Sequence, residues 1–244
     1  MKNCKTILIM ILLTFGFKSF AAGFEKDVIR TDKGDLVLTF IGHGTLMMEH
    51  DGKVVHIDPV GQYADYAKLP KADLILVTHQ HGDHLDGAAI SKIKKENTEI
   101  WMAEVCQTGC PEGKVLKNGE KARAAGIEVE AVPAYNIVHK RPNGVPFHPK
   151  GEGNGYILDF AGTRVYVAGD TENIPEMKAL KNITVAFLPM NLPYTMTPAM
   201  VADAARAFRP RILYPYHFGN TDPAELVKLL AGEKDVEVRI RKLQ

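Results

Sequence analysis

The chain has 244 residues, of which 45% are hydrophobic and 24% charged, and its formal net charge is +1. This length and composition allow one sizeable hydrophobic core. We find no Gly/Ser linker, low-complexity tract or internal repeat, so we expect one domain over residues 23–244 after a leader. The nearly balanced charge provides no basic stripe of the kind that nucleic acid partners require.

Residues 1–22 have the layout of a secretory signal peptide. Lys2 and Lys5 precede a mostly apolar run from Ile7 to Phe17, and small residues around Ala22 suit cleavage. The apolar run is shorter than the roughly 20 residues of a membrane span, although an uncleaved anchor is the alternative. We therefore expect an exported protein, periplasmic or secreted, without stable membrane association after cleavage. Its mature formal charge would be about −2, because the leader removes three lysines and no acidic residue.

The first half of the mature chain is rich in predicted strands. They are separated by Gly-containing turns, as in a meander, and cover residues 35–41, 45–49, 53–57 and 73–79. The last of them is a continuous apolar run, which indicates a buried strand. Residues 86–96 follow as a predicted helix with Asp86 as its N-cap.

The second half repeats this alternation of strands and helices. We expect strands over 127–134, 155–160, 164–170, 185–190, 211–219 and 236–240, with a hairpin turn at Ala161-Gly162. Helices are predicted over 198–210, which begins and ends at proline, and over 223–232, which ends at a glycine. Two groups of strands with interspersed helices predict an α/β fold in which two sheets pack together and helices lie outside.

Two cysteines remain in the mature chain, Cys106 and Cys110, within CQTGCPEG. In an oxidising compartment the short turn between them favours a local disulfide. Free thiols or half of a metal site are the alternatives. A thiolate zinc site would need a second cysteine pair, which the sequence lacks.

The stretch THQHGDHLD, residues 78–86, concentrates histidine and aspartate at the end of a predicted strand. His79 and His81 are two residues apart in an extended segment, so their rings point the same way. A turn then directs Asp83 and His84 into nearly the same space. A hydrogen-bonded turn would explain one such histidine, but this set favours Zn²⁺, Mn²⁺, Fe or Co. Four ligands within six residues exceed the needs of one tetrahedral ion with an open position, so we expect two metals.

This pattern, His79-x-His81-x-Asp83-His84, resembles the signature of the metallo-β-lactamase superfamily of metal-dependent hydrolases. AGDT at 168–171 and PYHFG at 215–219 match later motifs, and IGHGT at 41–45 and IDP at 57–59 match the early part of the fold. The run from AVPAYN through FHPKGEGNGY to VYVAGDT is similar to the branch that includes ascorbate-6-phosphate lactonase. The resemblance covers essentially the whole mature chain and implies a four-layer αββα sandwich.

The resemblance also implies a ligand set for two divalent metal ions, with zinc ahead of manganese or iron. His79 and His81 match ligands of metal 1, and Asp83, His84 and His217 match ligands of metal 2. Asp170 matches the carboxylate that bridges both metals. Taken alone, Asp170 suits an ordinary turn and His217 a structural histidine. The joint pattern favours the ligand roles.

One position departs from the family pattern. Metal 1 usually takes a third histidine from a strand end between the first cluster and Asp170, but VPAYN places Tyr135 and Asn136 there. Asn136 would coordinate only weakly through its amide oxygen. We predict that His148, in a loop rich in proline and glycine, folds back to complete metal 1. A loop histidine with a single hydrogen bond is the alternative.

Such a site would perform hydrolysis. Two cations that share one water lower its pKa towards about 7, and the resulting bridging hydroxide attacks a carbonyl or phosphoryl centre. Asp83 is the predicted catalytic residue, because it would orient this hydroxide and pass a proton to the leaving group. Asp58 would hold a ligand histidine. His43 lies near the site floor in the family pattern, although simple packing explains it equally well.

The substrate is expected to be small: a lactone, ester or amide, or a phosphorylated compound. Two loops would select it. The segment 136–154 would form a lid that carries Lys140, Arg141 and Lys150, and the loop 190–198 carries Tyr194. A non-catalytic metal- or ligand-binding protein on the same fold is the alternative function, and a homo-oligomer is possible for either.

Overall fold

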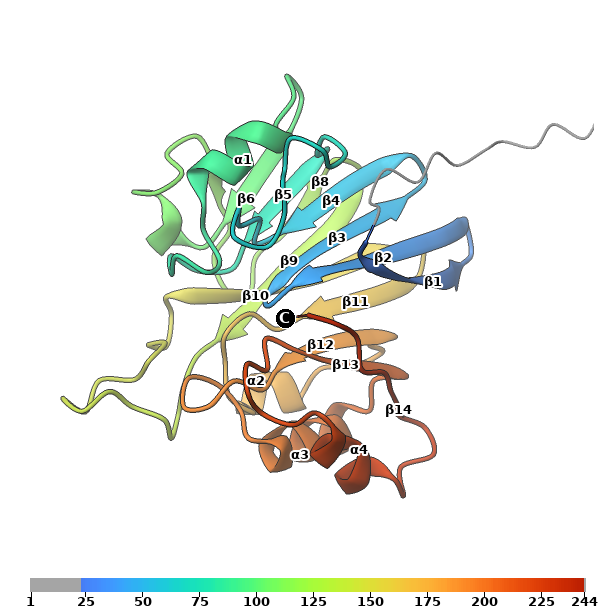
Figure 1. The fold of residues 1–244 in the computed structure, drawn as a ribbon, viewed down its shortest axis with the longest axis vertical. Helices are drawn as coiled ribbons and strands as arrows, with labels where there is room; N and C mark the ends of the chain where they lie inside the picture. Colours follow the sequence, from blue (N-terminus) through green and yellow to red (C-terminus); the bar gives the residue numbers. More distant parts are fainter. Residues whose placement is uncertain (1–22, 244) are drawn as a thin grey trace, which may run out of the picture.

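The structure is a computed structural model that describes residues 23–243. The predicted signal peptide, residues 1–22, lies outside them. Two seven-stranded sheets pack face to face, and the order of strands in each follows the chain (Figure 1). The first sheet comprises β1 (Glu25–Thr31), β2 (Gly34–Gly42), β3 (Thr45–His50), β4 (Lys53–Ile57), β5 (Leu74–Val77), β6 (Glu99–Met102) and β7 (Lys114–Val115). The second comprises β8 (Lys121–Ala124), β9 (Ile127–Ala134), β10 (Gly153–Phe160), β11 (Thr163–Val167), β12 (Val185–Pro189), β13 (Ile212–Tyr216) and β14 (Glu237–Val238).

Helices cover the outer face of each sheet (Figure 1). The first sheet carries α1 (Gly87–Ile93) and a short 3₁₀ turn, η1 (Glu104–Cys106). The second carries α2 (Pro175–Lys178), α3 (Pro198–Phe208) and α4 (Ala224–Leu230). This arrangement confirms the predicted four-layer αββα sandwich.

Both sheets are built in the same way. Strands β1 to β4 pair antiparallel and β4 to β7 pair parallel, and the second sheet repeats this with β8 to β11 and β11 to β14. Parallel neighbours end at the same edge of a sheet, so the loops after them gather there. The histidine- and aspartate-rich segments of the sequence occupy this edge.

The strand β5 shows how the sequence builds two cores. Its residues, LILV, are all buried, and alternate side chains of a strand point to opposite faces. Leu74 and Leu76 enter the large core between the sheets, whereas Ile75 and Val77 enter a smaller core beneath α1. A strand covered on both faces must be apolar throughout, as its sequence predicts.

The helix α1 begins where the sequence predicts and ends earlier. The side chain of Asp86 accepts hydrogen bonds from the backbone N–H groups of Ala88 and Ala89, which confirms it as the N-cap. The prediction of a helix as far as Glu96 was wrong. Lys94 leaves the helical conformation, and the backbone N–H of Lys95 donates to Thr98 Oγ1 in a local turn that competes with the helix.

Some elements carry too weak a sequence signal for prediction. The edge strand β1, with the sequence EKDVIRT, alternates charged and apolar residues irregularly, and β8 contains only KARA. The helix α2 has four residues. In contrast, the hairpin between β10 and β11 turns at Ala161 and Gly162, both with positive φ, as predicted.

Cys106 and Cys110 do not form the predicted disulfide. Cys106 and Cys110 are free thiols, and both are buried in the core beneath α1. They are separated by a single turn, in which the backbone N–H of Cys110 donates to the carbonyl of Cys106. Burial raises the pKa of the Cys106 thiol to about 12, so the group is neutral and packs as a small apolar side chain.

Residues 240–243, which we call the strap, leave the sheet after β14. The prediction of a strand as far as Ile240 was therefore wrong. Arg241 donates to both carboxylate oxygens of Asp27 on β1, with distances of 2.7 Å and 2.9 Å from Nη2, and this draws the strap across the end of the first sheet. Leu243 is buried, and its carbonyl accepts a hydrogen bond from the backbone N–H of His43.

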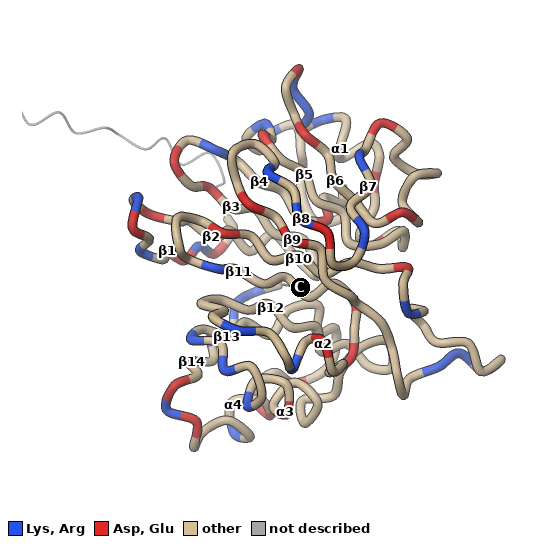
Figure 2. Tube along the Cα trace, turned by 180° about the vertical axis from the view of Figure 1, so that it is seen from behind, with Lys and Arg blue, Asp and Glu red and all other residues tan. Residues whose placement is uncertain are grey.

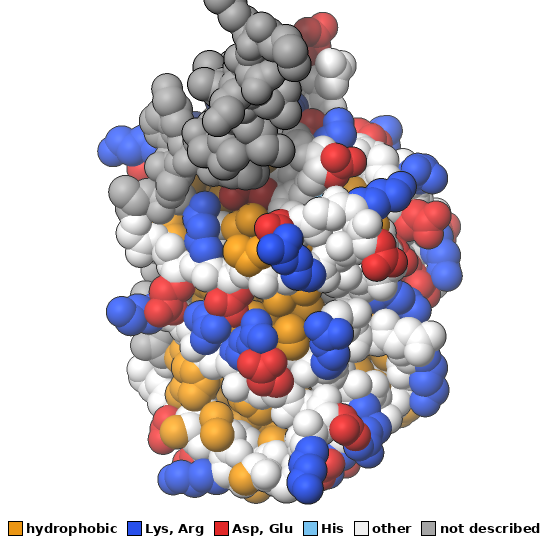
Figure 3. Space-filling model, turned by 90° about the vertical axis from the view of Figure 1, so that its right-hand side faces the viewer, with side chains coloured by type: hydrophobic (Ala, Val, Ile, Leu, Met, Phe, Trp, Pro, Cys, Tyr) orange, Lys and Arg blue, Asp and Glu red, His pale blue; other side chains and the backbone are white. Residues whose placement is uncertain are grey.

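Charges of both signs are interspersed along the chain when the molecule is viewed from behind (Figure 2). The face in Figure 3 also mixes Lys and Arg with Asp and Glu around small apolar areas. In residues 23–243, no helix is long and apolar enough to cross a bilayer.

Candidate metal centre

Seven imidazole and carboxylate side chains converge at one edge of the two sheets, and they are the residues that the sequence predicts as metal ligands. They come from four segments at strand ends or in loops: His79, His81, Asp83 and His84 after β5, His148 before β10, Asp170 after β11 and His217 after β13. The structure therefore brings together residues that are up to 138 positions apart in the sequence.

The segment after β5 folds as a tight turn. The backbone N–H groups of His84 and Leu85 both donate to the carbonyl of His81, so the chain reverses within four residues. This reversal places the imidazoles of His79 and His84 side by side, with ring centroids 4.1 Å apart. At position 44 only glycine fits, because a Cβ there would lie 2.7 Å from His84 Cε1.

The first group of potential ligands surrounds one oxygen of Asp170. His79 Nε2 lies 3.1 Å from His81 Nδ1 and 3.8 Å from Asp170 Oδ2. His148 Nε2 lies 3.3 Å from the same oxygen. These four residues are the set predicted for metal 1.

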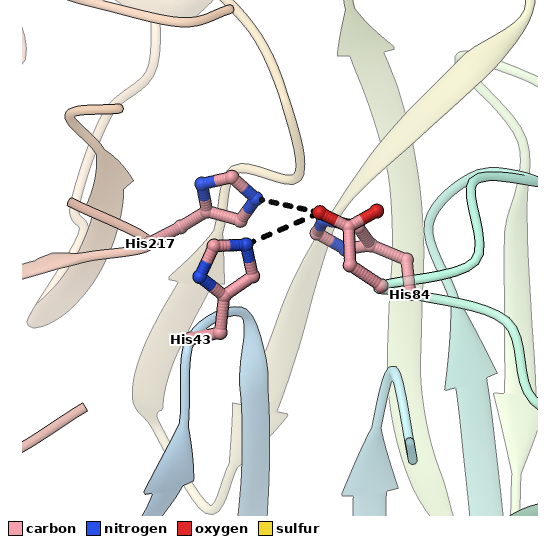
Figure 4. Close-up of side chains that lie close together, drawn as sticks. His43, His84 and His217 are labelled. Carbon is pink, nitrogen blue, oxygen red and sulfur yellow. Dashed lines mark hydrogen bonds and ion pairs between the residues drawn. The ribbon is translucent and has the colours of Figure 1, made fainter. Parts of the chain in front are cut away.

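The second group surrounds the other oxygen of Asp170. His84 Nε2 and His217 Nε2 each lie 3.5 Å from Asp170 Oδ1. Asp83 Oδ2 lies 3.6 Å from His217 Nε2 and 3.9 Å from His84 Nε2 (Figure 4). These four residues are the set predicted for metal 2, and Asp170 belongs to both groups.

The spacing of these atoms suits divalent cations. Ligand atoms about 2.0–2.2 Å from a tetrahedral ion lie roughly 3.3–3.6 Å from one another. The distances within the two groups, 3.1–3.9 Å, agree with this geometry.

Hydrogen bonding gives independent support. Three of the buried ligand atoms, His84 Nε2, His217 Nε2 and Asp170 Oδ1, have no hydrogen-bond partner within residues 23–243. A buried polar atom without a partner is costly, and a bound cation would satisfy all three. The residues present therefore fit a pair of metal ions.

Asp58 and Thr78 orient two of the imidazoles. Asp58 is fully buried, and its Oδ2 lies 2.8 Å from His84 Nδ1 and accepts a hydrogen bond from Thr78 Oγ1. Thr78 Oγ1 in turn lies 3.0 Å from His79 Nδ1. Both Nδ1 atoms are thereby occupied, which leaves Nε2 of each ring for a metal. This is the role predicted for Asp58.

Asn136 does not join the converging side chains; it orients His148, which does. Its Oδ1 lies 2.7 Å from His148 Nδ1 and accepts a second hydrogen bond from the His148 backbone N–H. Its amide nitrogen donates to Glu172 and to the carbonyl of Tyr194. With Nδ1 held by Asn136, His148 presents Nε2 to Asp170.

Glu172, which follows AGDT, has a role that the sequence did not reveal. Its carboxylate is completely buried and accepts hydrogen bonds from three consecutive backbone N–H groups, those of residues 137–139. The side chain of His139 also lies beside this carboxylate, with Nδ1 2.7 Å from Glu172 Oε1. The carboxylate thus fixes the start of the loop that carries His148. From the sequence alone, a buried glutamate at position 172 cannot be distinguished from a solvent-exposed one.

Three non-glycine residues at the site have positive φ: His43 at +52°, Asp58 at +45° and His217 at +46°. Each comes where a strand ends, and few residues with a Cβ adopt this conformation. Backbone strain of this kind persists where the surrounding structure enforces it, and it concentrates at functional sites. Here it turns each side chain from the strand direction toward the centre.

The charge of the centre favours cations. Burial raises the pKa of Asp170, but the neighbouring imidazoles of His217 and His84 outweigh it and hold that pKa well below its ordinary value. The pKa of Asp83 is lowered in the same way by His217 and His43. Both carboxyl groups are therefore ionised. Burial lowers the pKa of His79 well below its ordinary value, so this ring is neutral and able to bind a metal.

Two loops form the mouth of the site. Phe147 lines a small hollow beside His79, His81 and His148, and its ring meets that of Tyr194 edge to face, with centroids 5.0 Å apart. The same two loops expose apolar side chains: Ile137, Val138, Val145, Leu192 and Tyr194. The loop between β9 and β10 stands out from the body of the molecule at this point (Figure 1).

The basic residues of the loop between β9 and β10 are partly engaged by protein groups. Arg141 lies over the Phe147 ring and donates to the Phe147 carbonyl. Lys150 Nζ lies 2.9 Å from Glu176 Oε1 and contacts the Tyr135 ring. Neither contact is with the seven converging side chains.

The chain resembles known proteins over most of its length. Residues 37–217 match the family described as the beta-lactamase superfamily domain. A protein of Archaeoglobus fulgidus named UPF0173 metal-dependent hydrolase is 31% identical over 222 residues, which cover 84% of this chain and 95% of that protein.

Solved structures agree. A crystal structure from Parabacteroides distasonis, provisionally named a metal-dependent hydrolase, is 52% identical, with a TM-score of 0.86, and the match covers 91% of this chain and all of that one. The structure of Igni18 from Ignicoccus hospitalis, described as a novel metallo hydrolase, is 26% identical, with a TM-score of 0.68 over 85% of this chain and 95% of that one. The chain therefore belongs to the metallo-β-lactamase superfamily, within the UPF0173 family of metal-dependent hydrolases.

Proposed function

We propose that the protein is a dinuclear hydrolase that cleaves the acyl bond of a small lactone, ester or amide, and that zinc is its native metal. The observation that carries this proposal is the pair of four-atom ligand groups that share the two oxygens of Asp170. Nitrogen and oxygen donors without thiolates suit a catalytic rather than a structural zinc site. Two bound cations would supply an ionised water at neutral pH and polarise the scissile carbonyl.

Asp83 is the residue best placed to move a proton. Its side chain is 42% exposed, whereas those of His84, Asp170 and His217 are at most 4% exposed, so it borders both the metal groups and the solvent side of the centre. An ionised carboxylate in this position would orient the attacking water, accept a proton from it and then pass that proton to the leaving group.

The mouth of the site supports an acyl substrate over a phosphorylated one. Its exposed apolar side chains, among them Val138 and Leu192, would contact the apolar part of a substrate. The basic side chains of Arg141 and Lys150 have the protein partners described above, and an ionic substrate group would compete with those partners. The narrower relation to ascorbate-6-phosphate lactonase, whose substrate is phosphorylated, is therefore not part of the proposal.

The test is a substrate panel with zinc-loaded protein. Lactones, simple esters, amides, β-lactams and phosphodiesters would be compared, and the proposal expects the highest kcat/KM among lactones, esters or amides. His84→Ala should remain folded by circular dichroism. Loss of a residue that only supports a metal ligand typically costs up to about 100-fold in activity. Because His84→Ala removes a ligand itself, its loss should be larger. Unchanged turnover by that variant, or turnover of phosphodiesters alone, would contradict the proposal.

A further inference from the structure

We propose that His43 is a positioning residue for the second metal group, where it holds Asp83 and His217 in place. His43 Nε2 lies 3.1 Å from Asp83 Oδ2, and its ring centroid lies 3.7 Å from that of His217 (Figure 4). His43 belongs to the turn between β2 and β3, far in the sequence from both partners. The inference rests on the proposed dinuclear centre and assigns a role that the family signature of the ligands does not contain.

The supporting contacts are unevenly distributed among the candidate ligands. His79, His84 and His148 each have a side chain that occupies Nδ1, namely Thr78, Asp58 and Asn136. Within residues 23–243, Asp83 and His217 lack an equivalent partner outside the ligand set except for His43, which hydrogen-bonds Asp83 and packs its ring on His217. In the described part of the chain, His217 Nδ1 is buried without a hydrogen bond, and His43 is the side chain outside the ligand set that contacts Asp83.

Asp83 has a particular need for support. It is the most exposed member of its group, and an exposed carboxylate has several rotamers and water as a competing partner. The N–H of His43 Nε2 can donate to Asp83 Oδ2, which keeps this oxygen facing His84 and His217. A metal ligand held by such a hydrogen bond loses less freedom when it binds.

The backbone of His43 is enforced by its neighbours. With φ at +52° it occupies a region that residues with a Cβ rarely adopt. Two hydrogen bonds hold it there: its N–H donates to the carbonyl of Leu243 in the strap, and its carbonyl accepts from the N–H of His217. The strap is itself anchored to Asp27 through Arg241. This arrangement links the position of His43 directly to that of a ligand.

The side chain of His43 is fixed by ring contacts as well. Tyr63 stacks on it, with centroids 5.5 Å apart and an interplanar angle of 25°. Together with His217, this ring restricts rotation of the imidazole and keeps Nε2 directed at Asp83. A histidine that served only as packing would not require a hydrogen bond to the one exposed ligand.

The proposal is tested by metal binding rather than by turnover. Metal-free protein would be titrated with Co²⁺, and the affinities of the two sites would be measured from the visible absorption bands. His43→Gly is the main variant, since glycine favours positive φ and preserves the turn while it removes the imidazole. We expect its second site to weaken by about 10–100-fold and its first site to stay unchanged.

Two further variants complete the design. His43→Gln places an amide N–H near the position of Nε2, so it should recover part of the second-site affinity that His43→Gly loses. Asn136→Ala is the matched control, because it removes the partner of His148 and should weaken the first site instead. Folding of each variant would be verified by circular dichroism and urea unfolding.

The outcomes separate the two proposals. Wild-type protein that binds fewer than two Co²⁺ ions would overturn the dinuclear centre itself. If the wild type binds two ions, then an unchanged second site in His43→Gly overturns the role of His43. Loss of the first site in that variant, or a His43→Gln variant as weak as His43→Gly, would also overturn it.

Discussion

The geometry of the candidate metal centre depends on which nitrogen each imidazole presents. His148 shows this most clearly, because Asn136 holds Nδ1 and leaves Nε2 toward Asp170. The sequence offered these two residues as alternatives for one position, since both have an atom able to bind a metal. Only the fold shows that Asn136 holds His148 rather than replacing it, because their hydrogen bond joins residues from the two ends of one loop. Glu172 was missed for a similar reason: its burial depends on the path of the loop it anchors.

The buried His56 gives a prediction about pH. Burial lowers its pKa from 6.5 to about 4, so it is neutral in the folded protein and protonated in the unfolded chain between these values. The unfolded state then binds more protons, and stability falls as the pH drops below 6.5. From pH 7.5 to pH 5 this residue should cost about 2 kcal/mol of unfolding free energy.

The comparison with His56→Leu checks this value. The variant lacks the titrating group and the contact with the Pro70 carbonyl, so it should be less stable at pH 7.5 but should lose less stability on acidification. Urea unfolding of both proteins at pH 7.5 and pH 5 measures the difference. Equal losses in the two proteins would show that His56 does not titrate as its burial implies.

At the element scale, local sequence signals succeeded where one side chain determines the backbone. Asp86 sets the start of α1, and Ala161-Gly162 sets the hairpin of β10 and β11. They failed where a distant partner decides. The strand β14 ends at Val238, and Arg241 beyond it binds Asp27 on β1, a contact between opposite ends of the described chain. Likewise, the packing of Cys106 and Cys110 beneath α1 could not be read from their spacing.

The N-cap of α1 allows a direct test of one such signal. Asp86→Ala removes the acceptor for two helix N–H groups and for the backbone N–H of Gly61. We expect a loss of about 1–2 kcal/mol in the free energy of unfolding, measured in urea. Asp86→Asn keeps an acceptor and should lose much less. A difference below a few tenths of a kcal/mol between Asp86→Ala and the wild type would contradict the capping role.

At the scale of the whole molecule, the fold follows from repeated patterning. Each half of the chain supplies antiparallel strands and then parallel ones, and the pairing of the two sheets buries their apolar faces. This architecture and the motif residues were predictable, because the strands are apolar at regular intervals and the ligands lie at strand ends. The metal count, the metal identity and the substrate were not, since they depend on distances of a few ångströms across the centre.

We propose that seven side chains hold two metal ions that share Asp170. Anomalous diffraction from crystals of zinc-loaded protein, recorded on both sides of the zinc absorption edge, tests it most directly. We predict two anomalous peaks per chain, one bound by the group that contains His148 and one by the group that contains His217. A single peak at full zinc saturation, or peaks away from Asp170, would contradict the account.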